Sequence, residues 1–212
     1  MILSLPLTSA LAACVLLCAF LQISSQRIMT LLTLSRISAL ALAAAIFWQG
    51  LTWRCWPLGG MALLILASQV LALPYLFRRL IRHFDLSTEL ARKLPASWVM
   101  LIGLVPVGLA VMALMPMAKS PLPEEMGVLA RGLSVFLLGM WLMIIESRLL
   151  AQLIGFVTLE NGLVLGLINL MGQDWVADAA VMVLLLLVAC LVLLGVWRQL
   201  ALRQAETDGR KP

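Results

Sequence analysis

The chain has 212 residues, of which 63% are hydrophobic and 12% charged, and its mean hydropathy is +1.08. So apolar a chain has too little polar surface to cover a water-soluble domain, which excludes a soluble globular protein. The formal net charge is +5, but no basic stretch is interleaved with aromatic residues, so no nucleic-acid partner is indicated. The sequence therefore predicts an integral protein of the lipid bilayer.

Seven apolar stretches are long enough to cross a bilayer, which takes about 20 residues per helix. They are apolar at every position instead of alternating, which predicts helices and not the strands of a barrel. We therefore predict an all-α, polytopic membrane helix bundle, with residues 1–212 forming one transmembrane domain. The predicted spans are 3–23, 28–48, 58–78, 98–116, 127–147, 153–171 and 179–197.

Basic residues give the predicted orientation. They are concentrated in the segment 78–97 and in the tail 198–212, which lie on the same side because four spans separate them. The positive-inside rule places that side in the cytoplasm, so the N-terminus is predicted outside and the C-terminus inside. We interpret 78–97 as a cytoplasmic basic loop. An interfacial helix on anionic headgroups, or a docking surface for a soluble partner, is the alternative.

Cysteine and histidine indicate no enzymatic chemistry. The four cysteines form no C-x-x-C pair, and the only histidine, His83, lies in the basic segment far from any candidate nucleophile. Metal sites and activated nucleophiles need such groups in combination. The sequence therefore predicts no metal, no cofactor and no catalytic site within this chain.

The sixth span carries Glu160 among apolar residues. A charged side chain at that depth costs about 2 to 4 kcal/mol, so such a residue usually has a partner or handles protons. Asn161 follows it, and Gly162-x-x-x-Gly166 allows another helix backbone to approach closely. The sixth span is therefore predicted to lie inside the bundle or at a subunit interface.

Two further polar residues are predicted in the same layer, roughly 10 Å from the cytoplasmic boundary at 1.5 Å per residue. They are Arg36 in the second span and Gln69 in the third. We hypothesise an Arg36–Glu160 contact with Gln69 nearby, because a paired guanidinium and carboxylate neutralise each other. In the alternative, Arg36 extends to the headgroups and Glu160 is protonated.

Glu146 ends the fifth span. We interpret it as an interfacial, solvated residue. Alternatively, it lines a cytoplasmic entrance to Glu160 together with Arg148.

The run from Arg148 to Gly162 resembles the pattern R-x-x-x-Q-x-x-G-x-x-x-x-E-N-G of the E subunit of hydrogenase-4 and related formate hydrogenlyases. Gln69-Val-Leu-Ala-Leu-Pro74 adds a weaker match to the K-V-L-x-x-P of that family's third span. The family is related to the K subunit of respiratory NADH:quinone oxidoreductase and to the C subunit of multisubunit sodium/proton antiporters.

This resemblance implies a multi-pass subunit of the bacterial inner membrane, beside antiporter-like subunits and below a soluble redox arm. The subunit itself would be non-catalytic within an oxidoreductase complex. The matching carboxylate, Glu160, would belong to a chain of protonatable groups, so the proton path is assigned to Glu160, Arg36, Gln69, Asn161 and Glu146.

The chain departs from this pattern at two positions, with Gln69 where the family has a lysine and Arg36 where it has a glutamine. Arginine stays charged, so Arg36 cannot itself relay a proton. Three interpretations follow: a proton-translocating subunit, a scaffold subunit in which an Arg36–Glu160 pair fixes helix packing, and a free-standing small transporter.

Overall fold

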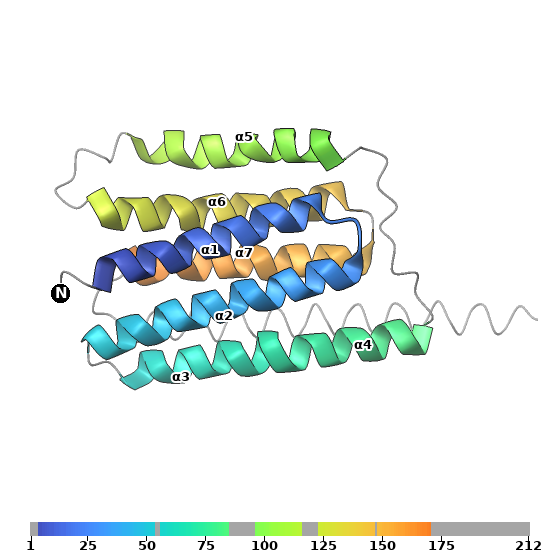
Figure 1. The fold of residues 1–212 in the computed structure, drawn as a ribbon, viewed down its shortest axis with the longest axis horizontal. Helices are drawn as coiled ribbons and strands as arrows, with labels where there is room; N and C mark the ends of the chain where they lie inside the picture. The colour runs from blue at the N-terminus through green and yellow to red at the C-terminus, as the bar shows by residue number, and fades with distance from the viewer. Residues whose placement is uncertain (1–3, 54–55, 85–95, 116–122, 147, 171–212) are drawn as a thin grey trace, which may run out of the picture.

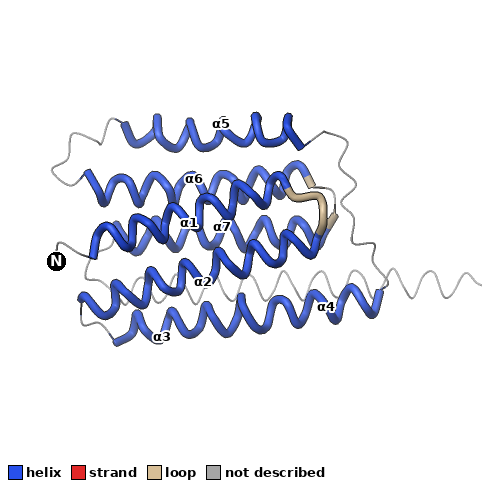
Figure 2. The backbone as a smooth tube through the Cα atoms, viewed as in Figure 1, coloured by secondary structure: helices blue, strands red, loops and turns tan. Residues whose placement is uncertain are grey.

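The computed structural model describes residues 4–53, 56–84, 96–115, 123–146 and 148–170, and these residues form helices joined by short turns (Figures 1 and 2). Consecutive transmembrane segments run in alternating directions, as in an up-and-down bundle. The elements are α1 (Ser4–Ser24), α2 (Ile28–Trp53), α3 (Trp56–Ile65), a π-helical segment η1 (Leu66–Ala72), α4 (Leu73–Phe84), α5 (Ala96–Leu114), α6 (Pro123–Ile145) and α7 (Leu149–Leu170).

The predicted helical membrane bundle is confirmed for the described part of the chain. Five stretches are long and apolar enough to cross a bilayer, and a shorter apolar helix spans Trp98–Leu114. These six coincide with the first six predicted spans. The predicted seventh span, 179–197, and the tail 198–212 lie outside the described residues. The protein is therefore a multi-pass membrane protein.

The bundle is layered, with α5 at one edge and α3 and α4 at the other (Figure 1). Between them, α7 packs against α6 and α2, while α1 packs against α2, α5 and α6. We call the end at which α1 passes into α2 and α6 into α7 the inner end, because the sequence predicts that it faces the cytoplasm. The opposite end is the outer end.

Glycines bring the backbones of α6 and α7 into contact. A Cβ atom placed on Gly132 would lie 2.7 Å from the nitrogen of Gly166, and one on Gly162 would lie 2.8 Å from the oxygen of Gly132. Nearer the inner end, a Cβ atom on Gly155 would lie 3.1 Å from the oxygen of Gly139. Real Cβ atoms essentially never come within 3.0 Å of such atoms, so no side chain fits at Gly132 or Gly162, and the distance at Gly155 is tighter than most Cβ contacts. Most of the span Leu149–Leu167 is also buried, so it lies inside the bundle, which is the first of its two predicted positions.

The third span is one rod made of α3, η1 and α4 (Figure 2). Its π-helical segment has a local cause in Pro74, which lacks an N–H group and whose ring clashes with the carbonyl four residues earlier. The backbone widens there, and the Leu73 N–H donates to the oxygen of Ser68, five residues back.

The segment 78–97 differs from the predicted loop. α4 continues to Phe84 and α5 begins at Ala96, so both ends of the segment are helical, while 85–95 lie outside the described residues. The physical reason is that arginine is a good helix former, so the helix continues beyond the apolar run.

We expect Gly162→Ala to lower the melting temperature of the purified full-length chain in detergent, because the methyl group would push α7 away from α6. Overpacking of this kind costs about 1–3 kcal/mol. Gly108→Ala in α5 is the matched control, since nothing lies within 4 Å of its added Cβ atom. Equal melting temperatures for the two variants would contradict the close contact.

Candidate functional site

Glu160 lies deep within α7, eleven positions after the helix begins at Leu149, or about 16 Å along its axis. The predicted span 153–171 begins four residues later than the helix, and the predicted depth of roughly 10 Å was counted from residue 153. The Glu160 side chain is only 6% exposed. Its carboxylate is therefore buried near the middle of the span Leu149–Leu167.

The glycine contact fixes the direction in which Glu160 points. Glu160 precedes Gly162 by two residues, which corresponds to about 200° around a helix. It therefore lies on a face of α7 that is turned away from α6. α7 also packs against α2. Since α2 also contacts η1, this helix lies beside the elements that carry Glu160 and Gln69.

Arg36 shares this region but forms no ion pair with Glu160 among the described residues. On α2, the exposed side chains Thr33, Ile37 and Leu40 form a lipid-facing stripe, and the partly buried Arg36 lies at its edge. A side chain at this position can extend along the apolar surface towards the headgroups. The predicted Arg36–Glu160 contact is thus absent among the described residues, and the extension of Arg36 to the headgroups stays a prediction.

Polar side chains on three elements are buried in this half of the bundle. Gln69 of η1 is 8% exposed and Asn161 of α7 is 1% exposed, and Ser35 and Ser38 of α2 are also buried. Among the described residues, no hydrogen-bond partner exists for Gln69 Oε1, for either amide atom of Asn161, or for the two serine hydroxyl groups. In lipid, each polar group without a hydrogen-bond partner costs several kcal/mol, so the burial of these side chains is energetically unfavourable.

A buried hydrogen bond between Gln22 of α1 and Thr158 of α7 was missed by the sequence analysis. The two side chains are 0% and 1% exposed, and Thr158 Oγ1 lies 2.6 Å from Gln22 Oε1. A possible signal was Gln22 itself, a polar residue that stands two residues before the end of α1. Its burial shows that polar residues near a span end can face the interior.

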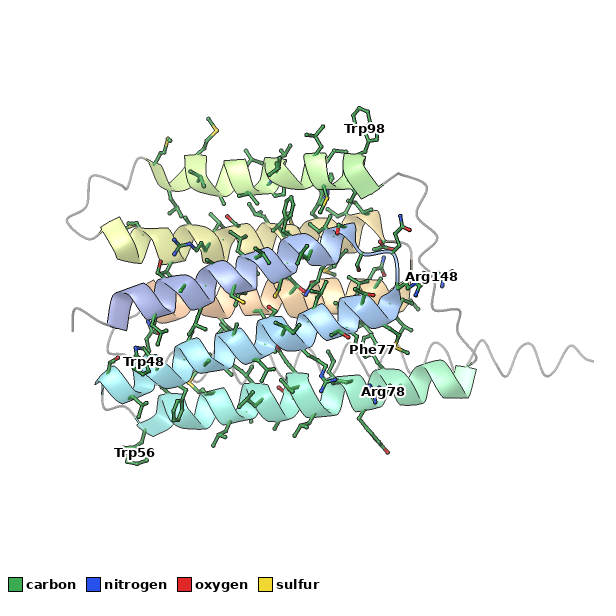
Figure 3. The ribbon with its side chains drawn as sticks, viewed as in Figure 1. Trp48, Trp56, Phe77, Arg78, Trp98 and Arg148 are labelled. Atoms are coloured by element: carbon green, nitrogen blue, oxygen red, sulfur yellow. The ribbon has the colours of Figure 1, made fainter. Side chains whose placement is uncertain are left out.

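The turn between α6 and α7 holds the remaining predicted site residue, Glu146, whose side chain is buried. Gln152 Nε2 donates a hydrogen bond of 2.8 Å to the backbone oxygen of Glu146, which caps the end of α6. Arg148 is partly buried at the same turn (Figure 3). Glu146 therefore lies at the inner end of the bundle, and about three helical turns separate the start of α7 from Glu160. Because the Glu146 side chain is buried, its interpretation as a solvated residue is wrong.

A second missed residue, Arg131, lies within α6 near the outer end. Its Nη1 donates a hydrogen bond of 2.7 Å to Ser9 Oγ of α1. This contact connects the two helices on the side of the bundle away from Glu160. Arg131 interrupts the fifth apolar span in the sequence, which was the signal available for finding it.

No family model, curated protein or solved structure matches this chain. Among the described residues, no group of three or more histidine, cysteine, aspartate or glutamate side chains is arranged to hold a metal ion.

The positions of Arg36 and Glu160 predict weak coupling between them. In a double-mutant cycle with Arg36→Gln and Glu160→Gln, the two changes in unfolding free energy should add to within about 0.5 kcal/mol, as they do for independent sites. Reversible unfolding of the full-length chain in mixed micelles measures the three variants. A coupling energy above about 1 kcal/mol would instead establish a direct interaction.

Proposed function

We propose that this chain is a membrane-arm subunit of a hydrogenase-4-like or NADH-dehydrogenase-like complex in a bacterial inner membrane, and that Glu160 takes part in its redox-coupled proton translocation. The observation that carries the proposal is a carboxylate buried near the middle of a transmembrane helix without a hydrogen bond or ion pair among the described residues. Burial of such a residue is energetically unfavourable, and proton relays are among the functions that such residues mark.

The packing of α7 supports this proposal. Within the run that resembles the hydrogenase subunit, packing explains some of the residues and leaves others unexplained. Gln152 caps the preceding turn, and Gly155 and Gly162 let α6 approach. Packing thus accounts for these three residues. It does not account for Glu160 and Asn161, which are polar, buried and unpaired with other described side chains. Their chemistry is the remaining reason for the pattern.

A carboxyl group in this place exchanges a proton with water or with a neighbouring protonatable group. Arg36 stays charged and does not relay protons, and Gln69 has no proton to exchange in this range. In the proposed path Glu160 is therefore the proton carrier. Gln69 and Asn161 orient it or the water beside it, and Arg36 sets the local electric field. Glu146, buried at the inner end, stands at the entrance.

The partners in this proposal are antiporter-like membrane subunits and a soluble redox arm. The subunit then contributes no electron-transfer chemistry of its own, and the redox reaction takes place in the arm. The buried carboxylate would transmit protons between this chain and its membrane neighbours.

A scaffold role in the same kind of complex is the second candidate. The glycine contact between α6 and α7 favours it, because it makes this pair a rigid packing unit. In this case Glu160 would be held protonated as a neutral group, and its replacement by glutamine would have little effect.

We expect Glu160→Gln to abolish proton translocation while leaving the complex assembled, because glutamine keeps the shape but carries no exchangeable acid. Glu160→Asp is the matched control, since it retains a carboxyl group on a side chain one methylene shorter and should retain activity. The measurement is dye-reported acidification of inverted membrane vesicles that carry the whole complex, driven by formate or by NADH. Assembly is checked by co-purification of the partner subunits.

Unchanged acidification by Glu160→Gln would reject the proton-path role and favour the scaffold. Loss of co-purification with both variants would place Glu160 in packing instead of proton transfer.

A further inference from the structure

The Thr158 hydroxyl group has one proton but lies within hydrogen-bond distance of two acceptor oxygens. Thr158 Oγ1 lies 2.6 Å from Gln22 Oε1 and 2.9 Å from the backbone oxygen of Ile154. A hydroxyl group has a single proton and donates to one acceptor at a time. If Thr158 donates to Ile154, the Gln22 amide must turn so that Nε2 donates to Thr158.

In both arrangements one end of the Gln22 amide has no partner. As placed, that end is Nε2, for which no acceptor exists among the described residues although the side chain is fully buried. Turning the amide exchanges Nε2 for Oε1 at the same position. A buried amide group without a partner costs about 1–3 kcal/mol by mutational measurements. Water is the usual partner of such groups in protein interiors.

Unpartnered polar atoms continue on both sides of this contact. Towards the inner end, Ser25 follows Gln22 at the end of α1, where its backbone N–H donates to the Gln22 oxygen at 3.2 Å. Its Oγ is buried and has no partner in the described part of the chain. Towards the middle of the bundle, Asn161 lies one turn beyond Thr158 on the same side of α7, and both its amide atoms lack a described partner.

We infer that water occupies the interior between α1 and α7 along Ser25, Gln22, Thr158 and Asn161, and connects the inner end of the bundle with Glu160. These residues form an ordered series. Ser25 is partly exposed at the end of α1, the hydrogen-bonded pair Gln22 and Thr158 bridges the two helices, and Asn161 is the residue next to Glu160 in α7. The path does not pass through Arg36 or Gln69, which lie on α2 and η1.

The presence of water is inferred from the residues of this chain alone, whereas its use as a proton route rests on the proposed function of Glu160. The two parts therefore need separate measurements. The first detects water in the interior without any translocation, and the second detects the route in the whole complex.

The first experiment uses silver ions, which are small enough to enter a water-filled interior and react with the thiols that water reaches. The full-length chain is purified with its four native cysteines replaced by alanine, and Gln22→Cys or Asn161→Cys is introduced. Leu138→Cys in α6 is the control, because Leu138 is buried in the same half of the bundle and has an apolar side chain. Each variant is incubated with silver nitrate, denatured and then labelled with a maleimide.

We expect silver to abolish maleimide labelling of the Gln22→Cys and Asn161→Cys variants and to leave the Leu138→Cys variant fully labelled. Labelling of all three variants despite silver would overturn the hydrated path. Far-ultraviolet circular dichroism and monodisperse elution confirm that each variant is folded before silver is added. For a variant that fails this check, Thr158→Cys takes its place, since a thiol closely matches the size of the threonine side chain.

The second experiment measures vesicle acidification by the complex with Thr158→Val, which keeps the shape of the side chain and removes its hydroxyl group. We expect a loss of at least half of the translocation rate. Ser134→Ala is the control, because the Ser134 hydroxyl donates only to Ala130 of its own helix. Equal rates for both variants would reject the route. If silver abolishes maleimide labelling while Glu160→Gln leaves the translocation rate unchanged, the proposed function is refuted and the hydrated path is retained.

Discussion

The backbone contact between α6 and α7 is the constraint on which the other interactions depend. Between apolar helices in lipid there is little hydrophobic driving force, so close van der Waals packing decides which helices associate. The glycines allow that packing and so fix the rotation of α7 about its axis. With one face held against α6, the polar residues on its other faces are buried: Thr158 reaches α1, and Glu160 lies on a face turned away from α6. The position of the carboxylate is thus a consequence of glycines elsewhere on the helix.

The helices themselves could be predicted from the sequence, because a backbone in lipid must satisfy its own hydrogen bonds and an apolar run of sufficient length has few other options. Six predicted spans coincide with described helices for this reason. The ends were less predictable. Leu149 and Phe84 lie beyond the predicted spans, since a helix can continue outside the apolar run that defines a span. Hydropathy reports where lipid ends, not where the helix does.

Most contacts between helices could not be predicted from the sequence. Spans that are apolar on all sides carry no amphipathic phase, so the sequence does not reveal which face of α1 or α6 meets its neighbour. The pairs Gln22–Thr158 and Arg131–Ser9 join residues more than 120 positions apart and depend on these rotations. Arg36 illustrates the same point. Its depth was used to pair it with Glu160, whereas the rotation of α2 places it beside the lipid-facing stripe.

The π-helical segment determines where the third span can lose a residue. Each π turn accommodates one residue more than an α turn, so removing a single residue between Leu66 and Ala72 would restore a regular α-helix with little change in the rotation of α4 relative to α3. Phe77, now fully buried (Figure 3), would then stay in the core. Removing a residue from an α-helical part of the span would instead rotate α4 by about 100° relative to α3 and turn Phe77 out of the core. A bilayer tolerates a helix longer or shorter by one residue. The third span tolerates such a loss only in its π-helical segment, because elsewhere its residue count is set by rotational phase and not by membrane thickness.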